Sequence, residues 1–439
     1  MTQEMGATIK AADTKQFETS ADATLATYEA KYNYWKWRSL LGFCLLYLFT
    51  YTGRLNMGIA LPFLKQEFGW SSAEVGVLAS LIFWSYGCSH IVWGRVGDKV
   101  GARVLLLLGA VLSTVLNWVV SFATSFTGIA IPWTLNGIAQ GMLFSPGTGM
   151  VAQWWPKKRR GTAMGLVIFS SGWATVVVWF LASYVAAPIW GWRGIFQFPT
   201  LAMGVLGVVA FFLVRSRPAD VGLQEYVEED VEQVAKETTE SHHGLAPYIN
   251  CLKDWKLCMA FLALGLCNFN RYALLTWIPM YYMEAAGYNI SKAGMVSMSL
   301  PVGMAMGPAL AGWISDRFFG GNRYQIIAGY SVIAGISAIL VGVTPSTYVT
   351  LGIVYLFMAG FFVYGAHGPI WALCTDLAGR KKASTAAGLM DFVSYVFAGL
   401  SAVGLGAILT MTGGNWTLAF SIIAAFSGIA AIVAVIPRR

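Results

Sequence analysis

The sequence alternates between long apolar runs and short polar segments. Twelve runs are each about 20 residues long, the length that a helix needs to cross the hydrocarbon core of a bilayer. The first six fall near residues 39–62, 74–93, 104–122, 126–150, 162–186 and 196–214, and the second six near 257–283, 292–314, 324–343, 347–374, 385–411 and 416–436. The pattern predicts an all-α, multi-pass membrane protein with twelve transmembrane helices.

A charged segment divides the twelve runs into two sets of six. It extends from Arg215 to about Asn250 and is too charged to enter a bilayer. We therefore expect a cytosolic N-terminal tail, a six-helix bundle, a cytosolic linker and a second six-helix bundle. Their predicted bounds are 1–38, 39–214, 215–255 and 256–436.

The two halves repeat each other in sequence. Arg54 and Arg271 are 217 positions apart, and Gly76 and Gly294 are 218 positions apart. A nearly constant shift indicates two pseudo-symmetric bundles related by an axis along the membrane normal. Transporters built in this way bind their substrate between the halves, near the bilayer midplane.

Composition and charge agree with a membrane protein. Hydrophobic residues make up 57% of the 439 residues and charged residues only 11%, whereas soluble proteins carry about 25% charged residues. Of the 29 Lys and Arg, 24 lie in the tail, the linker and alternate loops, three lie in the other loops, and Arg54 and Arg271 lie within apolar runs. This asymmetry predicts a protein of the plasma (inner) membrane with both termini in the cytoplasm. It also explains the net charge of +8 without nucleic acid.

One motif identifies the fold. Residues 94–103 match the G-x-x-x-D-[RK]-x-G-x-[RK] signature between the second and third helices of the major facilitator superfamily, which implies that fold here. We expect Gly94, Asp98, Lys99 and Arg103 to form a conformational latch at the cytosolic face. Asp316 and Arg317 belong to the degenerate second copy.

Arg54 and Arg271 are the main candidates for substrate binding. An arginine within a bilayer costs about 2.5–3.5 kcal/mol on insertion scales, and its planar fork suits phosphate or carboxylate. The alternative is a pair of structural arginines bonded to carbonyls or to an acidic partner. Either way, equivalent positions in the two halves predict that the two side chains converge.

Other polar residues of the spans are candidates for the same cavity. The substrate-binding candidates are Tyr47, Tyr51, Tyr86, His90 and Tyr395. Spacings of four and three place Tyr47, Tyr51 and Arg54 on one helical face. Packing is the alternative for each tyrosine, and a structural hydrogen bond is the alternative for His90.

Asp391 and His367 are candidates for coupling or charge balance. Asp391 precedes Tyr395 by one helical turn. It is a candidate counter-ion for Arg271, a proton carrier, or a contact for a cationic part of the substrate.

The chain resembles the organophosphate:phosphate antiporter family, typified by bacterial glycerol-3-phosphate and hexose-6-phosphate transporters. The matching segments include Tyr47–Asn56 with Pro62, Tyr86–Gly94, Arg271-Tyr272 with Trp277 and Pro279, and Gly360 through Thr385. The resemblance implies that Arg54 and Arg271 grip phosphate, and that Tyr47, Tyr51, Tyr86 and Tyr395 line the cavity. It also implies exchange of an organic phosphate for inorganic phosphate as the two halves rock around the site.

The sequence departs from this family at three positions. Leu55 stands where many members have a Lys, His90 replaces a Lys of the glycerol-3-phosphate transporter, and Ser171 replaces a His. The cavity is therefore less positive, which makes a carboxylate or sugar acid a credible substrate. The first span also partly resembles the anion:cation symporter family, whose members carry organic acids with protons or sodium.

We predict a monomeric secondary transporter of a small organic anion, not an enzyme. No nucleophile–base pair or phosphate-binding loop is recognisable, and the six cysteines form no CxxC pair, so we expect neither a cofactor nor a metal site. A receptor that senses a sugar phosphate without transporting it is a further alternative, since the resembled family includes one.

Overall fold

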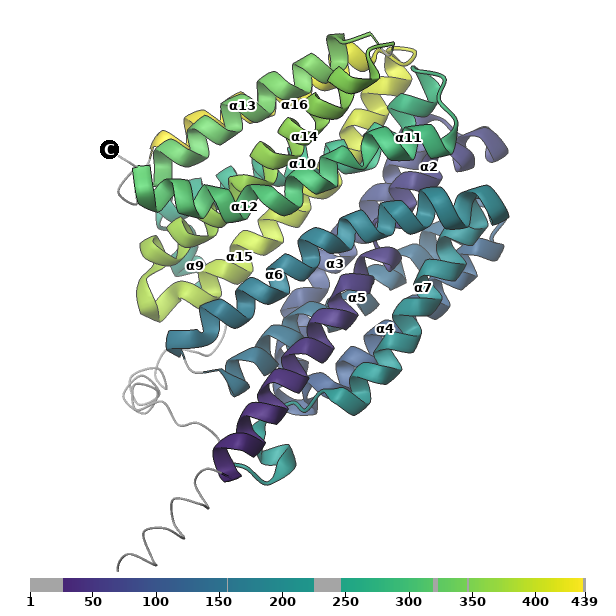
Figure 1. Ribbon diagram of the computed structural model, residues 1–439. Helices are drawn as coiled ribbons and strands as arrows, with labels where there is room; N and C mark the ends of the chain where they lie inside the picture. Colours follow the sequence, from purple (N-terminus) through teal and green to yellow (C-terminus); the bar gives the residue numbers. More distant parts are fainter. Residues whose placement is uncertain (1–26, 156, 225–245, 319–322, 346, 437–439) are drawn as a thin grey trace, which may run out of the picture.

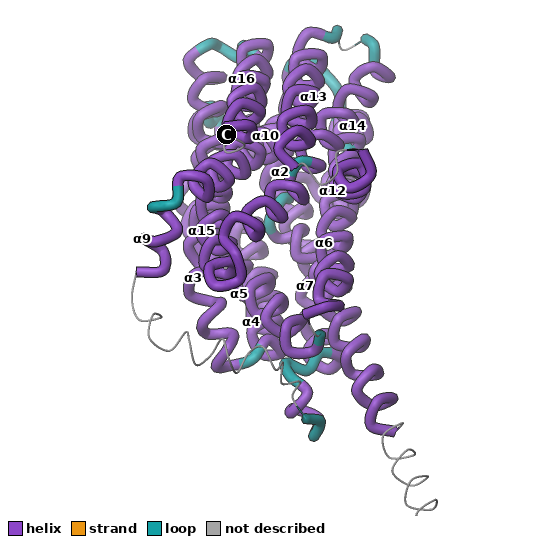
Figure 2. The backbone as a smooth tube through the Cα atoms, turned by 90° about the vertical axis from the view of Figure 1, so that its left-hand side faces the viewer, coloured by secondary structure: helices purple, strands orange, loops and turns teal. Residues whose placement is uncertain are grey.

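The computed structural model describes residues 27–155, 157–224, 246–318, 323–345 and 347–436. Two helical bundles lie side by side, the N-terminal one purple to teal and the C-terminal one green to yellow (Figure 1). Within these described ranges the chain forms helices and connecting loops but no strand (Figure 2).

The N-terminal bundle begins with a helix over residues 27–50. The elements that follow are η1 (Tyr51–Gly53), α2 (Asn56–Phe68), α3 (Ser72–Val100), α4 (Ala102–Phe122), α5 (Phe126–Trp154), α6 (Lys157–Phe180), η2 (Leu181–Ala186) and α7 (Ala187–Leu213). Within α7 the chain turns at Gly191, whose φ is 64°, so the fifth pass ends and the sixth begins there. A short 3-10 turn, η3 (Pro218–Val221), follows the bundle.

The C-terminal bundle is preceded by α9 (Ala246–Leu252). Its helices are α10 (Trp255–Glu284), α11 (Ile290–Ser297), α12 (Ser299–Phe318), α13 (Arg323–Val343), α14 (Val349–Gly365), α15 (His367–Met411) and α16 (Trp416–Val435). α15 contains the end of the apolar stretch Val349–Cys374 and all of the stretch Ala386–Met411.

The described helices make the predicted twelve passes, six in each bundle. Seven helical stretches among them are long and apolar enough to cross a membrane on length and composition alone. The outer surface of the bundles is apolar: Phe122, Ile189 and Ile432 are 69%, 61% and 65% exposed. A soluble protein would bury such side chains, so this surface suits contact with lipid.

The first helix extends further toward the N-terminus than the predicted span near 39–62, and into the segment expected to be a tail. The Tyr32 hydroxyl donates to the Trp154 carbonyl oxygen at 2.7 Å, and the Lys36 ammonium lies 4.7 Å from the centre of the Trp155 ring. These contacts with the end of α5 and with the residue after it stabilise polar turns that hydropathy alone places outside the membrane.

The bundles contact each other closely at the end where α2 finishes and α11 begins, which we call the α2–α11 end (Figure 1). A Cβ atom at Gly76 would lie 2.6 Å from the Ala402 carbonyl oxygen, and one at Gly294 would lie 2.4 Å from the Ser183 Cβ. The Lys65 ammonium also pairs with the Glu284 carboxylate at 3.0 Å across the same contact.

The sequence repeat is therefore visible in three dimensions. Gly76 and Gly294, 218 positions apart, both remove side-chain bulk where one bundle meets the other. A second glycine pair, Gly69 and Gly287, has φ values of 69° and 66° after α2 and α10. Left-handed backbone at both positions explains why both repeats retain glycine.

Candidate anion-binding site between the two bundles

The first pass is interrupted immediately before Arg54. Residues 51–53 form a 3-10 turn, and Arg54 has φ −127°. The Arg54 amide donates to the Tyr51 carbonyl oxygen at 3.0 Å, instead of to Thr50 as a continuous α-helix requires. The helix is therefore interrupted between Tyr47 and Arg54, although Tyr51 still contacts both of these residues.

Two carbonyl groups released by the break are hydrogen-bonded by side chains of α5. The Gln140 amide donates to the Thr50 oxygen at 3.1 Å, and the Asn136 amide donates to the Gly53 oxygen at 2.7 Å. The Ser113 hydroxyl joins the two amides: it donates to Asn136 and accepts from Gln140. We call Ser113, Asn136 and Gln140 the buried amide cluster; each is at most 1% exposed.

Arg54 is buried between aromatic rings. Its side chain is 2% exposed, and its Cζ lies 4.2 Å from the centre of the Tyr51 ring and 4.4 Å from that of Tyr86. Its Nε and Nη1 atoms are buried and have no hydrogen-bond partner among the described residues. Such N–H groups are unfavourable in a protein interior, so they are suited to a ligand that supplies acceptors.

Arg271 has equivalent surroundings in the C-terminal bundle. It is 6% exposed, and its Cζ lies 4.1 Å from the centre of the Tyr364 ring and 4.9 Å from that of Tyr272. In the described part of the chain its Nε has no hydrogen-bond partner. Unlike Arg54, it lies within an unbroken helix, α10.

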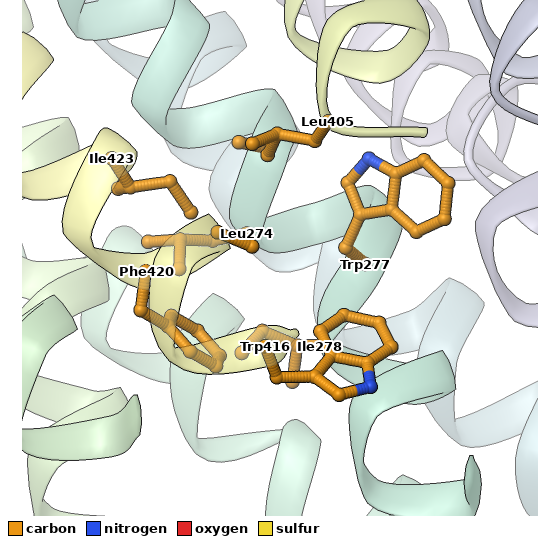
Figure 3. A pocket seen from close by; sticks show the side chains of 9 residues that line it. Leu274, Trp277, Ile278, Leu405, Trp416, Phe420 and Ile423 are labelled. Atoms are coloured by element: carbon orange, nitrogen blue, oxygen red, sulfur yellow. The ribbon is translucent and has the colours of Figure 1, made fainter. Parts of the chain in front are cut away.

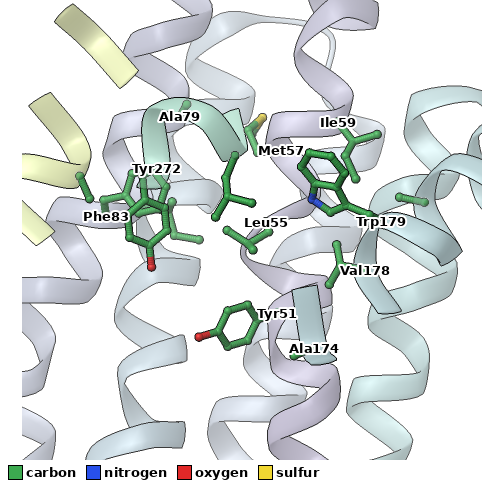
Figure 4. Packing of buried hydrophobic residues seen from close by; sticks show 14 of the residues in the cluster. Tyr51, Leu55, Met57, Ile59, Ala79, Phe83, Ala174, Val178, Trp179 and Tyr272 are labelled. Atoms are coloured by element: carbon green, nitrogen blue, oxygen red, sulfur yellow. The ribbon is translucent and has the colours of Figure 1, made fainter. Parts of the chain in front are cut away.

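The structure brings the two arginines to a shared group of tyrosines. Tyr51 and Tyr395 each interact electrostatically with both guanidinium groups. The rings of Tyr86 on α3 and Tyr395 on α15 are 4.8 Å apart, which closes the group across the bundle interface. In Figure 4 the hydroxyl groups of Tyr51 and Tyr272 point toward the same region.

Apolar side chains pack beside this group. Leu55, Met57, Ala79 and Phe83 are each at most 6% exposed, and they lie above the tyrosine hydroxyls in the view of Figure 4. Leu55 is the position at which the resembled family often has a Lys, and here it contributes to this apolar layer. These four side chains line one small pocket together with Arg54.

A separate pocket of the C-terminal bundle is apolar and does not include the arginines. It lies between α10, α15 and α16, and Trp277, Phe420 and Ile423 are among its lining residues (Figure 3). It offers no charged group to an anion.

The other residues predicted to take part in substrate binding or coupling differ in their hydrogen bonding. His90 Nδ1 lies 2.6 Å from the Ser145 hydroxyl, whereas its buried Nε2 has no hydrogen-bond partner in the ranges that the structure describes. Both ring nitrogens of His367 have partners: Nε2 lies 2.8 Å from Asn268 Oδ1, and Nδ1 lies 3.1 Å from the Val363 carbonyl oxygen. Tyr47 packs against Tyr51 with ring centres 5.9 Å apart.

Asp391 lies on α15 and is partly buried. It interacts electrostatically with Arg54 and Arg271. In the part of the chain that the structure describes, none of the ion pairs includes Asp391 or either of these arginines. The structure therefore does not show the direct salt bridge that a structural role for the arginines would use.

Only part of the predicted latch can be placed. Lys99 is exposed, and Arg103 bonds within its own bundle, where its Nε donates to the Phe211 carbonyl oxygen at 2.7 Å. The surroundings of Gly94 and the side chains of Asp98, Asp316 and Arg317 are outside the part of the chain that the structure describes.

Several residues of the site were not singled out from the sequence. Tyr272 directly follows Arg271, so its position next to a candidate residue could have indicated that it belongs to the site. Tyr364 comes from another helix and could not be paired with Arg271 by spacing. Asn136 and Gln140 are one helical turn apart, and two buried amides at that spacing indicate a polar contact in the membrane.

Comparison with known proteins places the chain in a family. The family model described as Major Facilitator Superfamily matches residues 43–402. A crystal structure of a bacterial homolog to the human lysosomal transporter Spinster, in an inward-facing and unoccupied conformation, superposes with a TM-score of 0.72. That match has 16% identity and covers 92% of this chain and 95% of the other. At this identity the likeness concerns the fold alone.

The curated relatives support the resemblance drawn from the sequence. The membrane sensor protein UhpC of Salmonella typhimurium is 27% identical over 422 residues, covering 92% of each chain. The glycerol-3-phosphate transporter of Bacillus subtilis is 28% identical over 384 residues, covering 84% of each. The prediction of a transporter fold without enzymatic activity is confirmed. This chain is a multi-pass integral membrane protein that belongs to the Major Facilitator Superfamily.

Proposed function

We propose that this protein exchanges a small organophosphate for inorganic phosphate by alternating access. One observation carries the proposal: Arg54 and Arg271 are buried, lack ion-pair partners among the described residues, and share Tyr51 and Tyr395 across the bundle interface. Phosphate offers oxygens to both guanidinium groups at once, and guanidinium forks bind such oxygens in pairs.

The proposed mechanism follows from the charges. Without an anion, the two guanidinium groups repel each other in a medium that screens them weakly. A bound phosphate attracts both and draws the bundles together, which lowers the barrier to reorientation. Because only an anion relieves the repulsion, the empty protein reorients slowly, and exchange is favoured over leak.

The proposal includes an orientation and an assembly state. Both termini face the cytoplasm from the plasma (inner) membrane, which the bias of Lys and Arg toward one set of segments supports. The chain acts as a monomer, since each arginine comes from one bundle of the same chain. The α2–α11 end then faces away from the cytoplasm.

The decisive experiment is counterflow in proteoliposomes loaded with labelled inorganic phosphate. External glycerol phosphate or a sugar phosphate should release the label, and Arg271→Ala should reduce release at least 100-fold. Arg193→Ala is the matched control, because Arg193 is exposed and pairs with Glu67 at 2.9 Å, away from the site. It should behave as the wild type does.

A different outcome would move the assignment to another transport class. If no phosphate is exchanged and a carboxylate or sugar acid enters with a proton or sodium gradient, the antiporter proposal fails. His90 and Asp391 would then be the first residues to test for coupling.

A sensor is the second candidate function, favoured by the likeness to the membrane sensor protein UhpC. A sensor would bind the same organophosphates with the same arginines. It would release little labelled phosphate in the counterflow assay while still binding ligand in titration calorimetry.

A further inference from the structure

A negatively charged group faces the proposed anion site. The Asp391 carboxylate interacts electrostatically with both arginines and also with Tyr86 and Tyr395. It forms no ion pair with any residue for which the structure describes a side chain. A carboxylate without an ion pair is costly within a membrane and would weaken the binding of a simple anion, so its presence calls for a function.

The wall beside Asp391 is suited to a cation. The rings of Tyr86 and Tyr395 are 4.8 Å apart, and the ring of Tyr272 is 6.0 Å from that of Tyr395. Arg54 occupies one face of Tyr86, whereas no described Lys or Arg lies over Tyr395. Aromatic faces next to a carboxylate are a common way to bind an ammonium group.

His90 supplies one more polar atom at this wall. The centre of its ring lies 4.3 Å from that of Tyr86 and 6.2 Å from that of Tyr395, and no described residue bonds its buried Nε2. An unpartnered polar atom beside the same two rings indicates that a polar part of a ligand is accommodated there.

The formal charges suggest what that ligand is. Two guanidinium groups and one carboxylate leave the site at +1. A phosphate dianion alone would leave Asp391 unpaired, whereas a phosphate dianion that also carries an ammonium group would pair all three charges.

We infer that the substrate is zwitterionic: an oxoanion head group joined by a short chain to an ammonium group. Arg54 and Arg271 bind the head group, and Asp391 binds the ammonium group against the ring of Tyr395. This inference rests on the proposed anion site and adds a specificity residue to it. It also explains why the cavity carries fewer cations than the resembled family, since the ammonium group of the substrate replaces one of them.

The test compares two probes that differ in one group, 2-aminoethyl phosphate and 2-hydroxyethyl phosphate. Full-length protein in proteoliposomes is loaded with labelled phosphate, and the concentration of each external probe that gives half-maximal release is measured. The wild type should respond to the amino probe at a concentration at least ten times lower. Asp391→Asn should bring the ratio of the two half-maximal concentrations to about one while 2-hydroxyethyl phosphate stays active. Asp391→Glu should retain the preference for the amino probe.

For a variant that does not transport, titration calorimetry on the purified chain measures the ratio of the dissociation constants of the two probes instead. Glu67→Gln is the control for loss of a carboxylate outside the cavity and should keep the wild-type ratio. Equal potency of the two probes in the wild type, or an unchanged ratio in Asp391→Asn, would overturn the inference.

The two proposals fail in different ways. If neither probe binds or releases phosphate, the anion site itself is refuted. If both act equally and Arg271→Ala abolishes both, the anion site stands and only the ammonium contact is refuted.

Discussion

Each arginine of the site is held by aromatic rings and forms no ion pair with an acid among the residues that the structure describes. Tyr51 and Tyr86 flank Arg54, and Tyr272 and Tyr364 flank Arg271, with distances from Cζ to the ring centres between 4.1 and 4.9 Å. A ring face stabilises a desolvated guanidinium by roughly 2 kcal/mol without using its N–H groups. The donors therefore stay available for a ligand, which a salt bridge would prevent.

Substitutions of Tyr86 separate the role of the ring from that of its hydroxyl. Tyr86→Phe keeps the ring against Arg54 and should transport within about threefold of the wild type. Tyr86→Ala removes the ring and should raise the KM for the organophosphate at least tenfold, since the guanidinium loses its support. Phosphate counterflow measures both variants, and a Phe variant as defective as the Ala variant would show that the hydroxyl is the essential part.

At the scale of elements, the interruption at residues 51–53 depends on a neighbouring helix. The Gly53 oxygen accepts from Asn136, and a Cβ at Gly53 would lie 2.7 Å from the Gln140 amide nitrogen. The break thus needs both a glycine without a side chain and the amides of α5. Together these residues fix the direction in which Arg54 leaves the backbone.

Asn136→Ala should weaken both stability and substrate binding. It leaves the buried Gly53 carbonyl without its shortest hydrogen bond, which costs about 1–3 kcal/mol and should lower the Tm. Because Arg54 is then less well positioned, the KM should rise more than kcat falls. Ser337→Ala is the comparison, since that buried hydroxyl bonds within its own helix. An Asn136→Ala protein with a lower Tm but unchanged KM would limit the amide to a structural role.

The sequence predicts elements better than it predicts their interruptions. Apolar runs indicate the twelve passes because lipid contact requires them, and the constant shift between Arg54 and Arg271 identifies equivalent positions. The break before Arg54 is not predictable from the same pattern, because it depends on Asn136 and Gln140 more than 80 positions away. The pairing of Tyr364 with Arg271 likewise requires the packing of α14 against α10.

At the scale of the whole molecule, the bundles meet through backbone at the α2–α11 end. Gly76 approaches the Ala402 carbonyl and Gly294 approaches Ser183, while the pair Lys65–Glu284 lies 29% and 32% exposed nearby. Exposed ion pairs contribute little to stability. Close backbone packing, and not the salt bridge, is therefore the main stabilisation of the closed arrangement at this end.

Gly76→Val should force this end apart. Its Cβ would meet the Ala402 oxygen at 2.6 Å, so the closed arrangement loses stability and counterflow should slow at least fivefold. Spin labels at the exposed positions Gln66 and Ala285, in a cysteine-free background, should report longer distances. Gly428→Val is the matched control, because no atom lies within 4 Å of a Cβ there. Unchanged distances in Gly76→Val would show that this contact does not hold the bundles together.

The two arginines differ in how they are attached to the protein, since Arg54 follows a break in its helix and Arg271 lies within the continuous α10. This difference affects the order of events when a ligand binds. Local motions take at most about microseconds, whereas whole bundles move in roughly microseconds to milliseconds. Arg54 can therefore adjust its side chain to an arriving ligand, within the limits set by Asn136 and Gln140, before either bundle moves. Binding should then show a fast, concentration-dependent phase followed by a slower phase whose rate no longer depends on ligand concentration.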